Sequence, residues 1–168
     1  GAFDECRYSK TEIERITIKA FDLARQRKKK VTSVDKSNVL ETSRLWRETV
    51  TEVSKRYNDV KVEHLLIDAM TMHMLTDSQR FDVILTENMF GDILSDQGGG
   101  ILGSLGLMPS ACIGPDKAYY EPSHGSAPDI AGKNIANPYS MIGSVAMMLE
   151  TSFNMGAEAK LVWEAMKS

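Results

Sequence analysis

The strongest constraint on the fold of this chain is a short apolar run, Phe81-Asp82-Val83-Ile84-Leu85-Thr86. A compact apolar run of this length is typical of a strand buried in a parallel sheet. The sequence turns helical again from Phe90 onward. Other strand-then-helix pairs occur on both sides of this one, and such alternation predicts the α/β class.

The spacing of apolar residues predicts the remaining elements. Helices are expected at about 11–29, 39–57, 68–75, from 90 onward, 138–154 and 157–166, and strands at 31–34 and 60–67. Thr11 and Glu14 are placed as a capping box for the first helix. Residues 98–114 are glycine-rich and apolar, residues 119–128 are extended or looped, and the glycines at 98–106 are the one visible candidate for a change of domain.

Composition excludes several classes of protein. Hydrophobic residues make up 42% and charged residues 26% of the chain, as in soluble globular proteins. The net charge of −3 gives no reason to expect nucleic acid or an acidic membrane as a partner. Cys6 and Cys112 show no metal-binding spacing and favour a reducing compartment. No stretch has the length of a membrane span, so we expect a cytoplasmic protein.

Three acids follow predicted strands. Asp92 and Asp96 are four residues apart on a predicted helix, which places both carboxylates on one face. Asp68 begins another helix in a comparable position. Carboxylates gathered at the ends of parallel strands suit Mg²⁺ or Mn²⁺. The alternative is that these acids complement the helix dipole or cap a helix, and spacing alone does not decide between the two interpretations.

Two further segments are candidates for chemistry. Lys36 lies at the end of a predicted strand, where a lysine is usually a surface charge but beside a divalent cation becomes a possible base. Residues 121–130 surround His124 with two prolines, a glycine and small hydroxyls. Loops of this kind often bind ligands, although a structural turn has the same composition.

One apparent motif is rejected. Gly98-Gly99-Gly100-Ile101-Leu102-Gly103 satisfies the dinucleotide pattern G-x-G-x-x-G. That pattern binds a dinucleotide when it follows a strand at once and opens a helix. Here the preceding strand ends near Thr86 and the intervening residues are predicted to be helical, so we attribute the match to chance.

Taken together, these segments resemble the isocitrate/isopropylmalate dehydrogenase family of β-hydroxyacid oxidative decarboxylases. The block Ser33-Val34-Asp35-Lys36-Ser37-Asn38 carries much of the resemblance, which extends over nearly the whole chain. The other matching blocks are 8–9, 12–16, 68–73, 88–96, 103–111, 124–133 and 136–138. The resemblance implies the fold of that family, a mixed sheet flanked by helices, and a homodimer whose active site is shared between subunits.

The resemblance also implies roles for particular residues. Asp92 and Asp96 would bind Mg²⁺ or Mn²⁺ from one subunit, and Asp68 would reach the same metal from the other. Lys36 would be the general base, with Asp68 as the second catalytic residue. The implied reaction is oxidative decarboxylation of 3-isopropylmalate to 2-oxoisocaproate in leucine biosynthesis, in which NAD⁺ accepts the hydride and the metal acts as a Lewis acid. Homoisocitrate, tartrate and D-malate are alternative substrates.

The resemblance places NAD on the segment around 121–137, with Asn38 near its nicotinamide end. The implied cofactor-binding residues are Asn38, Glu121, His124, Gly125, Ser126, Ala127, Pro128, Asp129, Ile130 and Asn137. Asp129 favours NAD over NADP, because a carboxylate accepts hydrogen bonds from a ribose diol and repels a 2′-phosphate.

Complete members of the family are roughly twice as long, so the chain is expected to be a C-terminal portion of an incomplete fold. We expect residues 1–102 to belong to a dimer-forming domain and 103–168 to the returning part of a nucleotide-binding domain. The substrate-binding arginines and the catalytic tyrosine would lie in the other part. The chain by itself is therefore expected to be inactive, and a catalytically inactive dimerisation fragment is the competing interpretation.

Overall fold

The computed structural model describes residues 1–167, which form two compact units that meet between Ser95 and Asp96. The division falls inside one helix, α4 (Asn88–Leu102). Besides the first part of α4, the first unit contains α1 (Lys10–Arg25), β1 (Lys30–Asp35), α2 (Glu41–Ser54), β2 (Lys61–Leu66), α3 (Ile67–Thr76), η1 (Ser78–Arg80) and β3 (Val83–Thr86). The second contains η2 (Leu105–Leu107), β4 (Pro109–Ile113), β5 (Ala118–Pro122), η3 (Pro128–Ile130), α5 (Tyr139–Thr151) and α6 (Gly156–Ala165).

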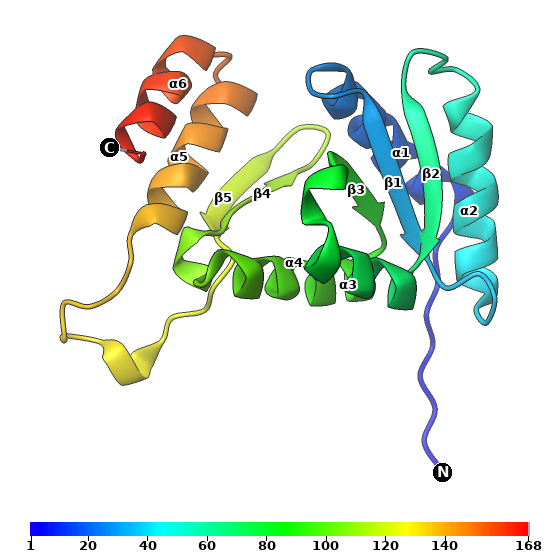
Figure 1. The fold of residues 1–168 in the computed structure, drawn as a ribbon, viewed down its shortest axis with the longest axis horizontal. Helices are drawn as coiled ribbons and strands as arrows, with labels where there is room; N and C mark the ends of the chain where they lie inside the picture. Colours follow the sequence, from blue (N-terminus) through cyan, green and yellow to red (C-terminus); the bar gives the residue numbers. More distant parts are fainter. Residues whose placement is uncertain (168) are drawn as a thin grey trace. The chain divides into compact units, whose positions relative to one another are not determined.

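The first unit is built on a parallel three-stranded sheet in the order β2-β1-β3 (Figure 1). Asp35 pairs with Leu66, and Val34 pairs with Thr86, so the strands end at nearly the same level. The side chains of β1 are buried from Val31 to Asp35, as is typical of a central parallel strand. This register brings the three strand-to-helix junctions to one edge of the sheet.

Helices cover both faces of this sheet. Phe21 of α1 and Val50 of α2 pack with Val31 and Leu85 in one core. On the other face, Met70 of α3 and Leu94 of α4 pack with Val34, and these positions form a second core. Because side chains alternate along β1, Val31 lies in the first core and Val34 in the second.

The second unit is an antiparallel pair, β4 with β5, covered by α5 and α6. A Cβ atom at Gly143 of α5 would lie 3.1 Å from the Trp163 ring of α6 and 3.1 Å from Cβ of Pro109. Glycine at this position therefore allows close approach of the two helices and the strand. The hydroxyl of Ser144, one residue further on, accepts the Ser110 N–H at 3.2 Å and so ties α5 to β4.

The structure confirms the α/β class but corrects several local predictions. The capping box is formed by Ser9 and Glu12, not by Thr11 and Glu14. The Ser9 hydroxyl accepts the Glu12 N–H at 3.3 Å, and the Glu12 carboxylate accepts the Ser9 N–H at 2.8 Å. The helix therefore begins one residue before Thr11, at Lys10.

The glycine-rich stretch contains the end of α4 and a strand, β4, that its composition did not predict. The G-x-G-x-x-G match lies in the last turns of α4 and ends at Gly103. This glycine is the first residue after the helix and has a φ of +85°, which is common for glycine at a helix C-terminus. This location agrees with the rejection of the motif. β4, which was not predicted, follows at Pro109–Ile113. The division within α4 lies close to the boundary expected after residue 102, whereas the functional identities of the two domains stay a prediction.

Candidate functional site

The carboxyl edge of the parallel sheet brings together two of the predicted catalytic residues. Lys36 comes directly after β1, and Asp68 lies in the first turn of α3, two residues after β2 ends. Because β1 and β2 are parallel neighbours in register, these two junctions are adjacent in space. This is the edge at which open α/β sheets bind ligands.

Lys36 and Asp68 form an ion pair. The distance from Lys36 Nζ to Asp68 Oδ1 is 2.8 Å, and the Lys36 side chain is 25% exposed compared with 65% for Asp68. The hydrogen bond from the lysine amine is the largest cause that holds the pKa of the Asp68 carboxyl below its usual value. An exposed pair of this kind contributes little to folding stability.

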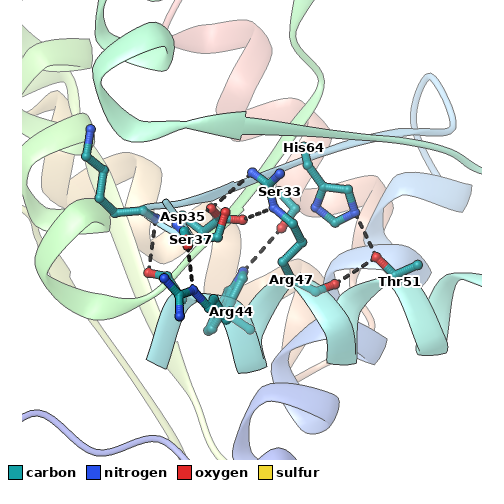
Figure 2. A network of polar contacts seen from close by, with 10 residues as sticks. Ser33, Asp35, Ser37, Arg44, Arg47, Thr51 and His64 are labelled. Atoms are coloured by element: carbon teal, nitrogen blue, oxygen red, sulfur yellow. Dashed lines mark hydrogen bonds and ion pairs between the residues drawn. The ribbon is translucent and has the colours of Figure 1, made fainter. Parts of the chain in front are cut away.

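The turn that carries Lys36 is held by contacts with α2, and Figure 2 shows one of these, from Arg47 to Asp35. The Lys36 N–H donates to the Ser43 hydroxyl at 3.0 Å, and the Lys36 carbonyl oxygen accepts the N–H groups of Val39 and Leu40, each at 2.9 Å. Asp35, one residue earlier, accepts two hydrogen bonds from Arg47. Thus the lysine amine points toward α3, while the turn that carries it is held by the layer on the opposite face.

Sequence reasoning missed Ser43 and Arg47 as functional candidates. Their side chains contact no predicted ligand, and they act on Lys36 through its backbone and through its neighbour Asp35. The sequence does contain one signal for Arg47. It is a cationic residue twelve positions after Asp35, on the helix that packs against the strand containing Asp35. A buried acid at the end of a strand requires such a partner.

Asp92 and Asp96 lie on the exposed side of α4, as their spacing predicts. Within residues 1–167, no salt bridge or side-chain hydrogen bond engages either carboxylate. Two free carboxylates four residues apart on a helix offer hard oxygen ligands that fit Mg²⁺ or Mn²⁺. Among the described residues, no group of three or more histidine, cysteine, aspartate or glutamate side chains is placed to hold a metal ion.

The predicted cofactor segment forms a long exposed loop between β5 and α5 in the second unit. Glu121 belongs to β5, and Pro128, Asp129 and Ile130 form the short helix η3. His124, Gly125, Ser126 and Ala127 lie between these elements, and the His124 Nδ1 atom is 2.8 Å from the Gly125 carbonyl oxygen. A long loop with little regular structure, anchored at both ends, is typical of a ligand-binding segment.

Local geometry fixes the ends of this loop. Ala127 adopts φ +43° immediately before η3, a conformation that is uncommon for a residue with a Cβ atom. At the other end, the Asn137 side-chain oxygen accepts the Tyr139 N–H at 3.0 Å, where α5 begins. A Cβ atom at Gly106 would lie 2.9 Å from Asn137 Cβ, so glycine is required for the η2 segment to pass close to this residue. Asn38, the remaining predicted cofactor contact, is exposed in the turn after Lys36 in the first unit.

Comparison with known proteins identifies a family over the full length of the chain. The family model described as "Isocitrate/isopropylmalate dehydrogenase" matches residues 1–168. The chain belongs to the isocitrate/isopropylmalate dehydrogenase family. This membership confirms the predicted resemblance and the predicted fold.

Individual members of the family are closely similar to the chain. A 3-isopropylmalate dehydrogenase of Oceanobacillus iheyensis is 58% identical over 166 residues, which are 98% of this chain and 45% of that protein. A 3-isopropylmalate dehydrogenase of Staphylococcus haemolyticus is 59% identical over 157 residues, which are 92% of this chain and 45% of that protein. The crystal structure of isocitrate dehydrogenase from Methylococcus capsulatus has a TM-score of 0.89 and 47% identity, and the match covers 93% of this chain and 46% of that one.

The chain therefore spans about half the length of the relatives that it matches. No helix among residues 1–167 is long and apolar enough to cross a membrane.

Proposed function

We propose that the protein carries out NAD-dependent oxidative decarboxylation of 3-isopropylmalate to 2-oxoisocaproate, a step in leucine biosynthesis. The observation that carries this proposal is the Lys36–Asp68 pair at the carboxyl edge of the sheet, within a chain 58% identical to a 3-isopropylmalate dehydrogenase. The proposed enzyme includes this chain together with the part that corresponds to the remainder of its relatives. A cytoplasmic location is part of the same proposal.

The metal site is proposed to form between two subunits. Asp92 and Asp96 would bind Mg²⁺ or Mn²⁺ from one subunit, and Asp68 of the partner subunit would add a third carboxylate. The observation that supports this division is that Asp92 and Asp96 have free carboxylates on one exposed helix face. Coordination by Asp68 would compete with its ion pair to Lys36.

This competition gives Lys36 its proposed role. With Asp68 engaged at the metal site, the Lys36 ammonium would lose its ion-pair partner. After it gives its proton to solvent, the neutral amine would be placed to accept the proton of the substrate hydroxyl as general base. When bound, the divalent cation supplies Lewis acidity and NAD⁺ supplies the hydride acceptor. The fixed backbone of Lys36 keeps the amine directed toward the α3 side, where Asp68 lies.

NAD is proposed to bind along the loop between β5 and α5, with Asn38 near the nicotinamide. Asp129 is exposed in η3, where its carboxylate is free to accept hydrogen bonds from a ribose diol. The same negative charge opposes a 2′-phosphate and so favours NAD over NADP.

A homodimer is proposed because apolar side chains on two neighbouring helices are exposed to solvent. Met72 and Leu75 of α3 are 54% and 70% exposed, and Met89 and Ile93 of α4 are 55% and 52% exposed. Several exposed large apolar side chains of this kind are consistent with a protein–protein interface on these helices. It lies on the helices that carry Asp68 and Asp92, as an active site shared between subunits requires.

The test is a substrate panel with the complete protein, NAD⁺ and Mn²⁺. We expect reduction of NAD⁺ with isopropylmalate at a kcat/KM well above that for homoisocitrate, tartrate or D-malate. Lys36→Met should abolish this turnover, whereas Lys61→Met, on the exposed side of β2, should not. Preference for one of the other three acids would replace the proposed substrate and retain the reaction class.

The second candidate function is a catalytically inactive dimerisation fragment. The observation behind it is that the chain spans 45% of the length of a relative that it matches. A protein that consists of these residues alone would associate through α3 and α4 and show no turnover. Mass spectrometry of the natural protein, combined with the substrate panel, separates the two functions.

A further inference from the structure

We propose that Asp35, Ser43 and Arg47 are positioning residues that hold the turn bearing Lys36, and that turnover depends on this clamp. The inference rests on the proposed function for its catalytic consequence, but the clamp itself is a structural statement that is tested independently. We refer to these three residues as the Lys36 clamp.

The first part of the clamp is an ion pair between a buried acid, Asp35, and a partly exposed arginine, Arg47. The Asp35 side chain is 1% exposed. Arg47 donates from Nε to Asp35 Oδ2 at 2.8 Å and from Nη2 to Oδ1 at 3.0 Å. This two-point contact fixes the orientation of the carboxylate as well as its position. Figure 2 shows the Arg47 guanidinium from α2 directed at Asp35 at the end of β1.

The Asp35 carboxylate also holds the residue that follows Lys36. Its Oδ1 atom accepts the Ser37 N–H at 2.9 Å. The same oxygen is therefore shared between Arg47 and the backbone of the turn. An aspartate that accepts an N–H two residues ahead closes an Asx turn, and here the arginine locks that turn by holding the aspartate.

The second part of the clamp acts on Lys36 itself. The Ser43 hydroxyl, 3% exposed at the level of the whole residue, accepts the Lys36 N–H at 3.0 Å. The backbone N–H groups on both sides of the Lys36 Cα atom are thus held, one by Ser43 and one by Asp35. The lysine side chain itself makes only the contact with Asp68 among the described contacts of residues 1–167.

Two features indicate that this arrangement serves the lysine and not merely the fold. An ion pair that includes a buried acid is weak evidence for stability, since removing the charges from water costs about as much as their attraction returns. In addition, its polar atoms converge on the one turn that carries the proposed base. A displacement of about 1 Å at a catalytic group lowers turnover about 100-fold, so such a turn benefits from being held rigidly.

The same sheet supplies a matched control at its opposite end. Asp82, just before β3, has a side chain that is 2% exposed and accepts Arg27 Nε at 2.8 Å and the Lys28 N–H at 2.9 Å. Like Asp35, it is a buried carboxylate that pairs with an arginine and accepts a backbone N–H, although its arginine makes one contact instead of two. It lies at the amino end of the strands, away from Lys36. Asp82→Asn therefore reports the cost of disturbing a buried acid without disturbing the lysine.

The experiment compares Asp35→Asn, Arg47→Met and Arg47→Lys with Asp82→Asn in the complete protein. We expect amide hydrogen exchange at Lys36 and Ser37 to become about fivefold to tenfold faster in Asp35→Asn and Arg47→Met, and to stay unchanged in Asp82→Asn. With isopropylmalate, NAD⁺ and Mn²⁺, kcat should fall about 10- to 100-fold in the same two variants while the KM for isopropylmalate stays within about twofold. Arg47→Lys should recover part of kcat, because it restores the charge but not the two-point contact.

Ser43→Ala is the milder variant to use where Asp35→Asn or Arg47→Met fails to fold. It removes the acceptor of the Lys36 N–H and leaves the ion pair intact. Unchanged exchange at Lys36 and Ser37 overturns the clamp, whether or not the protein turns over. Faster exchange with unchanged kcat, or equal loss of kcat in Asp82→Asn, overturns its catalytic role. A wild-type protein without isopropylmalate turnover contradicts the proposed function, and the catalytic role of the clamp with it.

Discussion

At the residue scale, Arg47 is linked to residues of two neighbouring strands. Its side chain binds Asp35 of β1, and its carbonyl oxygen is linked through Thr51 to His64 of β2. His64 pairs with Ser33 in the β1–β2 register, and its Nε2 atom is 3.1 Å from the Thr51 hydroxyl oxygen. The Thr51 hydroxyl donates to the Arg47 carbonyl oxygen at 2.7 Å, so its oxygen must accept from His64 Nε2–H. This assigns the proton of the neutral imidazole to Nε2 and leaves the buried Nδ1 without a hydrogen-bond partner among residues 1–167.

The protonation of His64 gives a prediction for stability against pH. Burial, followed by the charge of Arg47, lowers the pKa of His64 below its ordinary value of 6.5, against the opposing charge of Asp35. The unfolded chain therefore binds more protons below pH 6.5 than the folded one, and stability falls as the pH decreases through this region. We expect Tm to decrease between pH 7 and pH 5 more steeply in the wild type than in His64→Gln.

Differential scanning calorimetry at four pH values measures this difference. The carboxyl groups with lowered pKa values, such as Asp59 and Glu63, lose their contribution at lower pH and do not interfere. Parallel Tm profiles for the two proteins would contradict the prediction.

Asp129 gives a second prediction at this scale, which concerns cofactor choice. Replacement of its carboxylate by a cation in Asp129→Lys removes the repulsion of a 2′-phosphate and the acceptor for a ribose diol. We expect the ratio of kcat/KM for NAD⁺ to that for NADP⁺ to fall at least about tenfold. Asp116→Lys, in the exposed turn between β4 and β5, is the control of equal charge change and should leave the ratio unaltered.

At the scale of elements, the sequence predicted what depends on local pattern and missed what depends on packing. The strand at 81–86 and the helix that contains Asp92 and Asp96 were predicted because apolar runs and helical spacing are local signals. β4 was missed because its five residues become a strand by pairing with β5 and packing under α5. The Lys36–Asp68 contact likewise depends on the register of two strands, which no single segment specifies.

The position of the α1 cap gives a third prediction. Ser9→Ala removes the hydroxyl that accepts the Glu12 N–H and should lower the free energy of unfolding by about 1 kcal/mol. Thr11→Ala, at the position that the sequence alone favoured, should change it by no more than about 0.5 kcal/mol, because Thr11 is exposed inside the helix. Urea unfolding followed by circular dichroism measures both, and equal effects would place the cap at Thr11.

The contact between α5 and α6 gives a fourth prediction. Gly143→Ala places a methyl group 3.1 Å from the Trp163 ring and should destabilise the protein by about 1–3 kcal/mol. Gly156→Ala, at the start of α6, meets no atom within 4 Å and should be neutral or stabilising. Thermal unfolding of the two variants distinguishes steric overlap from the general effect of replacing a helical glycine.

At the scale of the whole molecule, the first unit carries the proposed base and the proposed metal ligands Asp68 and Asp92, and the second carries Asp96 and the proposed cofactor loop. The proposed Asp92–Asp96 pair stands on either side of the division between the units, on one continuous helix. The chain spans 45% of the length of the relatives it matches, so its site is proposed to be completed by further polypeptide and by a second subunit.

Association gives the fifth prediction. Ile93→Asp places a charge on the exposed apolar surface of α4 and should raise the dimer dissociation constant at least about tenfold, because burial of an unpaired charge opposes assembly. Leu23→Asp makes the same change at an exposed leucine of α1 and should leave association unaltered. Analytical ultracentrifugation over a range of concentrations measures both constants, and equal weakening would argue against an interface on α4.

The parallel register described for β1, β2 and β3 also bears on how such a protein can change over evolution. Lys36, Asp68 and Asp92 all lie just beyond a strand end, whereas the residues that fill the interior lie within the strands and helices. Substitutions in the junctions can therefore change the proposed catalytic residues while the buried residues still stabilise the fold. In a fold of this kind, substrate specificity can change without loss of the folded state. This provides a physical route to a family of dehydrogenases that act on different acids.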